Sequence, residues 1–334
     1  MIGILFTGGT ISMRIDPATG SAVPALSAEE IVAQAPDLPG VTDFEIEEFG
    51  RLPGPHVTPE HMWRLANRAA AWLDRPDIDG LVITHGTDTI EETAFMLDLL
   101  LTTDKPVVMV GAMRTVSDPS WDGPANLLAA ASVAASPSSA GVGVVVVMDE
   151  HIFPAREVCK IHTESSGSFA TPEFGPLGMV DSGEVVYRRR PMPRPTWHTA
   201  DAEPGLRVRR LETRVDLVQA FTGMTDRPLR HAIADGAVGL ALIAFGRGNV
   251  PPTIVPAVRD AVASGVLVTV SSRSLAGRVS ARYGYDGGGL QLRDAGAVLS
   301  GDLSGAQARL LQMVALGHTD GNAAAAAELI RKFQ

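Results

Sequence analysis

Two short loops combine glycine with hydroxyl-bearing and acidic residues, which are side chains that can carry out amide chemistry. Residues 7–10 read Thr-Gly-Gly-Thr, and residues 85–89 read His-Gly-Thr-Asp-Thr. A threonine hydroxyl attacks a carbonyl carbon when a neighbouring group removes its proton. Glycines such as Gly9 and Gly86 let backbone and ligand approach closely, and N–H groups at such turns stabilise an oxyanion. Together the loops indicate a hydroxyl nucleophile with oxyanion donors beside it.

Each loop alone has other interpretations. Residues 7–10 fit a plain strand-ending turn or a weak phosphate-binding loop. The phosphate interpretation fails because no Gly-x-x-x-x-Gly-Lys pattern follows, and no Gly-x-Gly-x-x-Gly motif follows a strand. Asp88 could also simply cap a helix beside Thr89. The two loops together are therefore a much more specific sign of catalysis than either loop alone.

Apolar runs alternate with amphipathic stretches in the N-terminal half, a pattern typical of parallel strands covered by helices. Thr89 and Glu92 predict a capping box that fixes where the second helix starts. Both loops follow strands directly, and ligands of open parallel sheets bind beyond the carboxyl ends of the strands. Buried strands are expected at residues 2–6, 80–84, 107–110 and 142–147, and helices at 59–73 and 90–101.

The amino-acid composition changes near residue 187. Three arginines at 188–190 precede a proline-rich stretch with few apolar residues, which predicts a linker at residues 191–212 between domains at 1–190 and 213–334. We interpret the arginines as a solvated charge run rather than an anion site. Beyond the linker, strands are expected at 215–221, 238–245 and 266–271, and helices at 228–235, 252–263, 306–316 and 323–333.

The composition is that of an ordinary globular protein. Hydrophobic residues make up 45% of the 334 residues and charged residues 20%, which excludes disorder, collagen and coiled coil. The net charge of −10 disfavours phosphate-rich partners such as nucleic acids. No apolar stretch approaches the ~20 residues of a membrane span. The single Cys159, and the absence of a recognisable signal peptide, predict a reducing, cytoplasmic location.

No metal or cofactor is expected. His56 and His61 lie five residues apart, but no cluster of histidines and cysteines accompanies them. Cys159 has no thiolate-stabilising motif beside it and is interpreted as a packing residue. His85 is interpreted as a local hydrogen-bonding residue rather than a base.

Several segments, in order along the chain, match the motifs of a known family. Residues 6–11 read Phe-Thr-Gly-Gly-Thr-Ile, and residues 83–93 read Ile-Thr-His-Gly-Thr-Asp-Thr-Ile-Glu-Glu-Thr. Further matches lie at residues 108–114, 122–127, 158–160, 175–178 and 246–249. In these segments the chain resembles the bacterial-type L-asparaginase family over nearly its whole length. We therefore expect an α/β protein, with a larger N-terminal domain on a mainly parallel flavodoxin-like sheet and a smaller C-terminal α/β domain.

The resemblance implies roles for individual residues. Thr10 resembles the threonine that attacks the side-chain amide and forms an acyl-enzyme. Thr87, Asp88 and Lys160 resemble a proton-relay triad, although Lys160 alone, after an apolar Val-Cys pair, would normally be a surface charge. The Thr87 N–H and Ala112 resemble the oxyanion-stabilising positions. Asp88 also resembles a carboxylate that binds the ammonium group of the substrate.

The sequence departs from the family pattern in two places. Well-known members carry a tyrosine on a mobile lid a dozen or so residues after the nucleophile, and residues 14–26 contain none. The family also commonly holds the substrate α-carboxylate with a serine, and residues 51–56 (Arg-Leu-Pro-Gly-Pro-His) contain none. Arg51 or His56 could take that role, since a guanidinium fork suits a carboxylate. Equally, the substrate could lack an α-carboxylate.

The resemblance further implies a homodimer or homotetramer whose sites are completed between subunits. Asn249 resembles a residue that reaches an active site across a subunit contact. Tyr283 and Tyr285, in a glycine-rich loop, are the two tyrosines that could replace the lid phenol from a neighbouring subunit, with surface packing as the simpler interpretation.

The expected function is hydrolysis of L-asparagine to L-aspartate and ammonia through a threonine acyl-enzyme, with a small-molecule amide as the only partner besides other copies of the chain. Three alternatives remain. The first is hydrolysis of another small amide, imide or lactam by the same route. The second is a glutaminase-type subunit of an amidotransferase acting on transfer RNA, which the acidic chain disfavours. The third is a non-catalytic amino-acid-binding regulatory protein.

Overall fold

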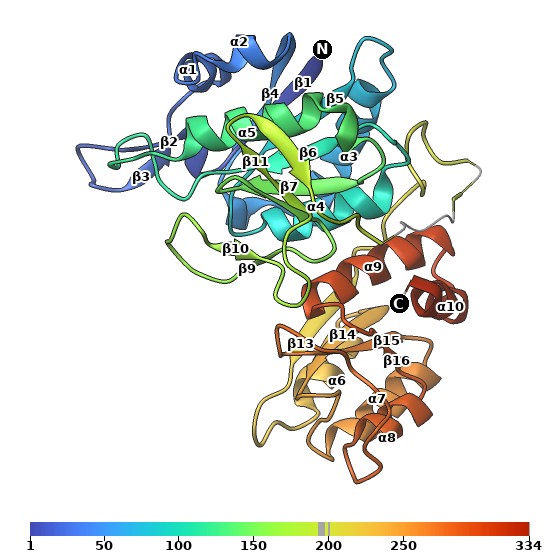
Figure 1. Ribbon diagram of the computed structural model, residues 1–334. Helices are drawn as coiled ribbons and strands as arrows, with labels where there is room; N and C mark the ends of the chain where they lie inside the picture. Colours follow the sequence, from blue (N-terminus) through green and yellow to red (C-terminus); the bar gives the residue numbers. More distant parts are fainter. Residues whose placement is uncertain (193–197, 200, 334) are drawn as a thin grey trace. The chain divides into compact units, whose positions relative to one another are not determined.

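The computed structural model describes residues 1–192, 198–199 and 201–333 (Figure 1). The chain divides into two units, one of Met1–Arg194 with Glu203–Leu206 and one of Pro195–Ala202 with Arg207–Gln334. The expected linker at residues 191–212 includes residues 193–197 and 200, which lie outside the described residues. The domain boundaries predicted from the sequence therefore stay a prediction.

The first unit is built on an eight-stranded sheet with the order β12-β11-β8-β7-β6-β5-β1-β4. Five neighbouring strands, from β4 to β7, run parallel, and β8, β11 and β12 extend the sheet antiparallel. The mainly parallel α/β fold expected from the sequence is therefore confirmed. The strands are β1 (Ile2–Gly8), β4 (Phe44–Leu52), β5 (Gly80–Thr84), β6 (Val107–Val110), β7 (Val144–Met148), β8 (His151–Pro154), β11 (Gly178–Asp181) and β12 (Glu184–Tyr187).

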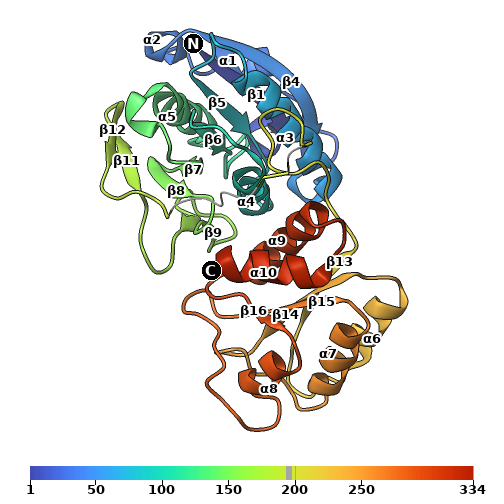
Figure 2. The same ribbon diagram turned by 90° about the vertical axis from the view of Figure 1, so that its right-hand side faces the viewer.

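Helices cover both faces of this sheet (Figures 1 and 2). One face packs on α5 (Gly123–Ala135), with α1 (Ala28–Ala33) and α2 (Leu38–Val41) beyond it, and Ile2, Ile4 and Phe6 of β1 belong to that core. The other face packs on α3 (Pro59–Leu73) and α4 (Ile90–Leu100). Because both faces are buried, the parallel strands are apolar at nearly every position.

The start of α4 corrects one expectation. The helix begins at Ile90, after Thr89, as predicted, but the predicted capping box is absent, because Thr89 makes no side-chain cap bond. Its hydroxyl donates instead to the carbonyl oxygen of Gly54, 2.8 Å away. The Thr89 side chain therefore joins two loops rather than capping its own helix.

Two small hairpins complete the first unit. The hairpin of β2 (Met13–Ile15) and β3 (Ala22–Pro24) occupies the segment where the family pattern has its lid. The hairpin of β9 (Cys159–Lys160) and β10 (Phe169–Ala170) pairs Lys160 with Phe169. Short 3-10 turns at Thr10–Ser12 and Gly54–His56 follow β1 and precede α3.

The second unit has a four-stranded parallel sheet with the order β13-β14-β15-β16. Helices α6, α7 and α8 lie on one side of it, and α9 and α10 on the other (Figure 2). The elements are β13 (Val215–Gln219), α6 (Arg227–Ala234), β14 (Gly239–Ala244), α7 (Ile254–Ala263), β15 (Leu267–Ser272), α8 (Gly289–Asp294), β16 (Val298–Leu299), α9 (Gly305–His318) and α10 (Ala323–Phe333). In the described part of the chain, every helix is too short or too polar to cross a bilayer.

Candidate active site

Three loops of the first unit meet through glycine backbones. A Cβ atom on Gly9 would lie 2.5 Å from the backbone nitrogen of Gly86, and one on Gly86 would lie 2.7 Å from the Cα of Gly54. Contacts this short require glycine, so the loops after β1 and β5 and the turn before α3 touch main chain to main chain. Since β1 and β5 are neighbouring parallel strands, their carboxyl ends share one edge of the sheet.

The loop after β1 is held by hydrogen bonds that leave the Thr10 hydroxyl available. The Thr7 hydroxyl donates to the Thr84 carbonyl oxygen at 2.6 Å, and Ser12 Oγ donates to the Gly9 carbonyl oxygen at 2.9 Å. Thr10 starts the 3-10 turn and is half-buried, and its hydroxyl has no hydrogen-bond partner among the described residues. The fixed loop thus presents one unengaged threonine hydroxyl.

Lys160 joins the two residues that follow Gly86. Its Nζ lies 2.9 Å from Thr87 Oγ1 and 2.7 Å from Asp88 Oδ1. The Lys160 side chain is 15% exposed and that of Asp88 61%, whereas Thr87 is buried. The three residues that the resemblance groups as a relay are therefore in direct contact, and the ion pair opens to solvent on the Asp88 side.

Glu91 holds the strand that carries Lys160. From the first turn of α4, its Oε2 accepts the backbone N–H of Lys160 at 2.6 Å. Burial raises the pKa of the Glu91 carboxyl above its usual value. Burial, and after it the charge of Glu91, raises the pKa of the neighbouring Cys159 thiol to about 11. Cys159 is a neutral thiol at neutral pH, which agrees with its interpretation as a packing residue.

His85 is buried and neutral. Burial lowers the pKa of its imidazole to about 4. Its Nδ1 lies 2.9 Å from the carbonyl oxygen of Gly86, which only accepts, so Nδ1 carries the hydrogen and donates it. His85 thus stabilises the turn that carries Thr87, as expected from the sequence.

The loop after β6 carries Ala112, which is fully buried. A Cβ on Gly111 would lie 2.9 Å from Thr87 Cγ2, so this loop lies against the relay threonine. The Asp122 carboxylate accepts the N–H of Met113 at 2.9 Å, and the Asn126 amide donates to the Gly111 carbonyl oxygen at 3.1 Å. The main chain on both sides of Ala112 is therefore fixed by these two side chains.

Glu91, Asp122 and Asn126 hold the main chain of loops in the candidate site, and the sequence analysis assigned them no role. All three lie inside the segments that carry the family resemblance, at residues 83–93 and 122–127. Their partners are backbone groups of other loops, with no pattern in the sequence around them to predict the contact. The only sign in the sequence that these residues matter is that they lie in segments matching the family motifs.

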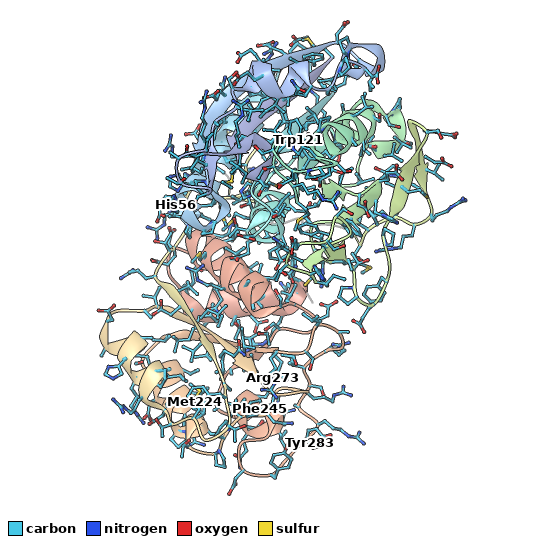
Figure 3. The ribbon with its side chains drawn as sticks, turned by 90° about the vertical axis from the view of Figure 1, so that its left-hand side faces the viewer. His56, Trp121, Met224, Phe245, Arg273 and Tyr283 are labelled. Carbon is cyan, nitrogen blue, oxygen red and sulfur yellow. The ribbon has the colours of Figure 1, made fainter. Side chains whose placement is uncertain are left out.

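Arg51 and His56 lie beside the loop cluster without joining the relay. The Arg51 guanidinium donates to both oxygens of Glu48, at 2.7 and 2.9 Å. His56 is exposed at the end of the 3-10 turn that begins at Gly54 (Figure 3). Their assignment to a substrate carboxylate stays a prediction, and for Arg51 a carboxylate ligand would have to compete with Glu48.

The predicted site residue of the second unit has a local partner. Asn249 Oδ1 accepts the N–H of Gly289 at 3.3 Å, and its backbone pairs with Phe245. The Arg273 guanidinium lies over the Phe245 ring, 4.8 Å from its centroid (Figure 3). Tyr283 and Tyr285 are 41% and 55% exposed, with ring centroids 5.5 Å apart. A role of these residues at an active site stays a prediction.

Known proteins are similar to this chain in sequence and in fold along almost its whole length. The model of the N-terminal asparaginase domain matches residues 1–193, and that of the glutaminase/asparaginase C-terminal domain matches residues 214–329. A probable cytoplasmic L-asparaginase from Campylobacter jejuni, known from its crystal structure, has a TM-score of 0.86 and 29% identity, covering 99% of this chain and 98% of that one.

Curated relatives are similar over comparable lengths. A probable L-asparaginase of Deinococcus radiodurans is 39% identical, over 94% of this chain and 92% of that protein. L-asparaginase 2 of Escherichia coli K12 is 35% identical, over 95% of this chain and 89% of that protein. One relative, from Haemophilus influenzae, is named periplasmic and the Campylobacter protein cytoplasmic, so the cytoplasmic location stays a prediction. By these matches the chain belongs to the asparaginase family and is an amidohydrolase of the L-asparaginase type.

Proposed function

We propose that the chain hydrolyses the side-chain amide of L-asparagine to L-aspartate and ammonia through an acyl-enzyme on Thr10. The contact of Lys160 Nζ with Thr87 Oγ1 at 2.9 Å and Asp88 Oδ1 at 2.7 Å carries this proposal. Thr10 and Thr87 each follow one of the two glycines whose backbones touch, Gly9 and Gly86. A hydroxyl and a proton relay are thereby brought to the same edge of the sheet.

In the first half-reaction, Thr10 Oγ1 forms a bond to the amide carbon. Lys160 gives one ammonium proton to the leaving nitrogen and is refilled, through Thr87, by the proton of the Thr10 hydroxyl, while the C–N bond breaks to release ammonia. The carbonyl oxygen takes up negative charge, which the N–H groups of Thr87 and Ala112 stabilise. Asp88 orients the Lys160 ammonium and, from its exposed side, can also bind the ammonium of the substrate.

In the second half-reaction, water attacks the acyl carbon. The same relay takes one proton from the water and returns it to Thr10 Oγ1, so that aspartate and the free enzyme result. No external oxidant, reductant or co-substrate other than water is needed for the balance.

Two variants with matched controls test this mechanism. Thr10→Ala should fold normally and lose nearly all ammonia release. Thr19→Ala, on the exposed hairpin loop, should fold normally and keep its ammonia release. Lys160→Met should lower kcat by about 10²–10⁴ with a much smaller change in KM. Lys105→Met removes an ammonium that donates to the carbonyls of Leu73 and Arg75, and should leave kcat intact.

Three outcomes would contradict the mechanism. Wild-type turnover by Thr10→Ala would remove Thr10 as the nucleophile. A KM effect without a kcat effect in Lys160→Met would remove the relay. Binding of asparagine by the wild type without ammonia release would favour an amino-acid-binding regulatory protein.

A second candidate function is hydrolysis of a small amide that lacks an α-carboxylate. It is favoured by the bidentate contact of Arg51 with Glu48, because the guanidinium proposed for the substrate carboxylate is already engaged. An ammonia-release screen over L- and D-asparagine, L- and D-glutamine and simple amides decides between the two candidates. A high kcat/KM for L-asparagine would exclude the second.

We also propose that the chain acts as a homodimer or homotetramer, with Asn249 of one copy completing the site of another, and that the two domains span residues 1–190 and 213–334. Support comes from the position of Asn249 in a matching segment. Light scattering, and mixing of inactive Thr10→Ala with inactive Asn249→Ala subunits, test the shared site. Activity should return in the mixture, and its absence would refute a site completed between subunits.

A further inference from the structure

A cavity of about 230 Å³ lies in the first unit, with none of the proposed catalytic residues among those that line it. Its volume equals that of roughly eight water molecules, enough for a small organic ligand. The walls come from the turn between β7 and β8, from β8 itself, and from β10 with the turn that follows it. The lining includes Met148, Asp149, His151, Phe153, Phe169 and Thr171.

Asp149 supplies an unengaged negative charge at this cavity. Its backbone N–H donates to Asn126 Oδ1 at 3.1 Å, and its carbonyl oxygen lies 2.7 Å from Nδ1 of His151. Its φ of 50° places it in the left-handed region. The carboxylate has neither a hydrogen bond nor an ion pair with any described residue. The main chain is thus held firmly while the charged group stays free for a ligand.

The remaining walls suit an apolar body with a cationic end. Phe153 and Phe169 are buried, and the His151 ring stacks on Phe153 with centroids 5.9 Å apart. Thr171 is 6% exposed, and its buried hydroxyl lacks a hydrogen-bond partner among the described residues. Aromatic rings attract cations, and a buried hydroxyl without a partner costs free energy.

We propose that this cavity binds a small organic ammonium compound, with the cationic group on Asp149 and the apolar part against Phe153 and Phe169. Charge-assisted hydrogen bonds to the carboxylate would orient the ligand. Glu150, also exposed beside Asp149, disfavours anions.

The cavity shares its walls with two supports of the proposed active site. Phe169 on β10 pairs with Lys160 on β9. Met148 Sδ accepts the N–H of Gly111 at 3.3 Å, directly before Ala112. A ligand in the cavity therefore contacts the strand beside the relay lysine and the side chain that supports the oxyanion loop. On the proposed function, occupancy should change kcat.

Calorimetric titration tests the site without relying on hydrolysis. Benzylammonium is the probe, with benzyl alcohol and benzoate as neutral and anionic compounds of similar shape. We expect saturable binding of benzylammonium to the wild type, weaker binding of benzyl alcohol and none of benzoate. Asp149→Asn should weaken benzylammonium binding about tenfold. Asparagine tolerates the left-handed conformation found there, so this variant should fold.

Two further variants separate the cavity from the active site and from a merely structural effect. Asp88→Asn removes the carboxylate that could bind an ammonium in the active site, and should leave benzylammonium affinity unchanged. Thr171→Val removes a buried hydroxyl without a partner and keeps the shape of the side chain, so its Tm should stay equal or rise while benzylammonium affinity is unchanged. Absent binding, equal affinity in Asp149→Asn, or loss of binding in Asp88→Asn would overturn the site.

The kinetic effect is tested separately. Benzylammonium should change kcat of the wild type with a half-maximal concentration equal to its Kd, and the same change in Asp149→Asn should need a concentration about tenfold higher. Binding with an unchanged kcat would refute the coupling. An enzyme that binds benzylammonium yet releases no ammonia from any amide would refute the proposed function and leave the cavity site standing.

Discussion

The contact between Gly9 and Gly86 can be broken by one methyl group, in the variant Gly9→Ala. Gly9 has φ 86° and ψ −176°, a backbone conformation that is essentially restricted to glycine. The added Cβ would lie 2.5 Å from the nitrogen and 2.6 Å from the Cα of Gly86. Both are backbone atoms, so no side-chain rotation relieves the clash. One of the two loops has to move.

The size of the movement follows from the distances. Carbon contacts are favourable at about 3.5–4.0 Å, so the loops have to separate by roughly 1 Å. The strained conformation costs about 1–3 kcal/mol, and overpacking adds about 1–3 kcal/mol. Since Thr10 follows Gly9 and Thr87 follows Gly86, the movement changes the distance between nucleophile and relay. A misplacement of about 1 Å costs about a hundredfold in rate.

Gly183→Ala is the matched control. Gly183 has φ 86° like Gly9, and it lies in the turn between β11 and β12 of the same unit. No heavy atom lies within 4 Å of the position its Cβ would take. The control therefore introduces backbone strain without a clash, and should lower the free energy of unfolding by about 1–2 kcal/mol without lowering kcat.

Urea denaturation and steady-state ammonia release measure the two effects. Gly9→Ala should lose more stability than Gly183→Ala and about a hundredfold in kcat. If Gly9→Ala kept the kcat of Gly183→Ala, the backbone contact between the two loops would have no part in catalysis.

Three further outcomes follow from the same geometry. The pKa of His85, lowered to about 4 by burial, keeps the imidazole neutral in the folded state, so its contribution to stability is complete above pH 6.5 and is lost as the pH falls toward 4. This contribution to the free energy of unfolding amounts to roughly 3 kcal/mol. The urea midpoint of His85→Gln should therefore fall less between pH 7 and pH 5 than the midpoint of the wild type. Asp122→Ala removes the acceptor of the Met113 and Arg114 N–H groups, and should lower kcat by at least about tenfold, as loss of one hydrogen bond to a charged group would. An unchanged kcat in Asp122→Ala would show that the Ala112 loop has no part in catalysis. The control is Asp118→Ala, because the Asp118 carboxylate accepts the N–H and the hydroxyl of Thr115 instead. Glu91→Ala should lower kcat with little change in KM, because Lys160 loses its backbone anchor, and Glu91→Gln, which keeps an acceptor, should restore most of it. Equal losses in both Glu91 variants would show that the charge, not the hydrogen bond, matters.

The core elements could be predicted from the sequence because their burial is complete. The runs at residues 80–84 and 107–110 are apolar at nearly every position, and β5 and β6 coincide with them. The helix expected at residues 59–73 is also observed without a shift, since Thr58 caps its start and its apolar residues recur on one face. Here local pattern and tertiary environment agree.

Elements stabilised by distant partners were missed. The strand β4 was not predicted, because acidic residues interrupt its apolar pattern. In the fold, Glu47 forms an ion pair with Arg68 of α3 at 2.6 Å. Glu45 forms another with Arg75, just beyond the end of α3, at 2.7 Å. The capping box at Thr89 failed for the same reason, since the hydroxyl bonds to Gly54 instead. A window of a few residues contains none of these partners.

Lys160 shows why the site was harder to predict than the sheet. Its two side-chain partners are 73 and 72 residues away in the sequence, and its own strand is two residues long. Nothing near it distinguishes it from a surface lysine, so its role came from the family resemblance alone. The physical cause lies elsewhere in the chain, because Glu91 binds its backbone while Thr87 and Asp88 bind its ammonium. Residues 87–91, a segment recognisable from the sequence, therefore determine where this lysine lies.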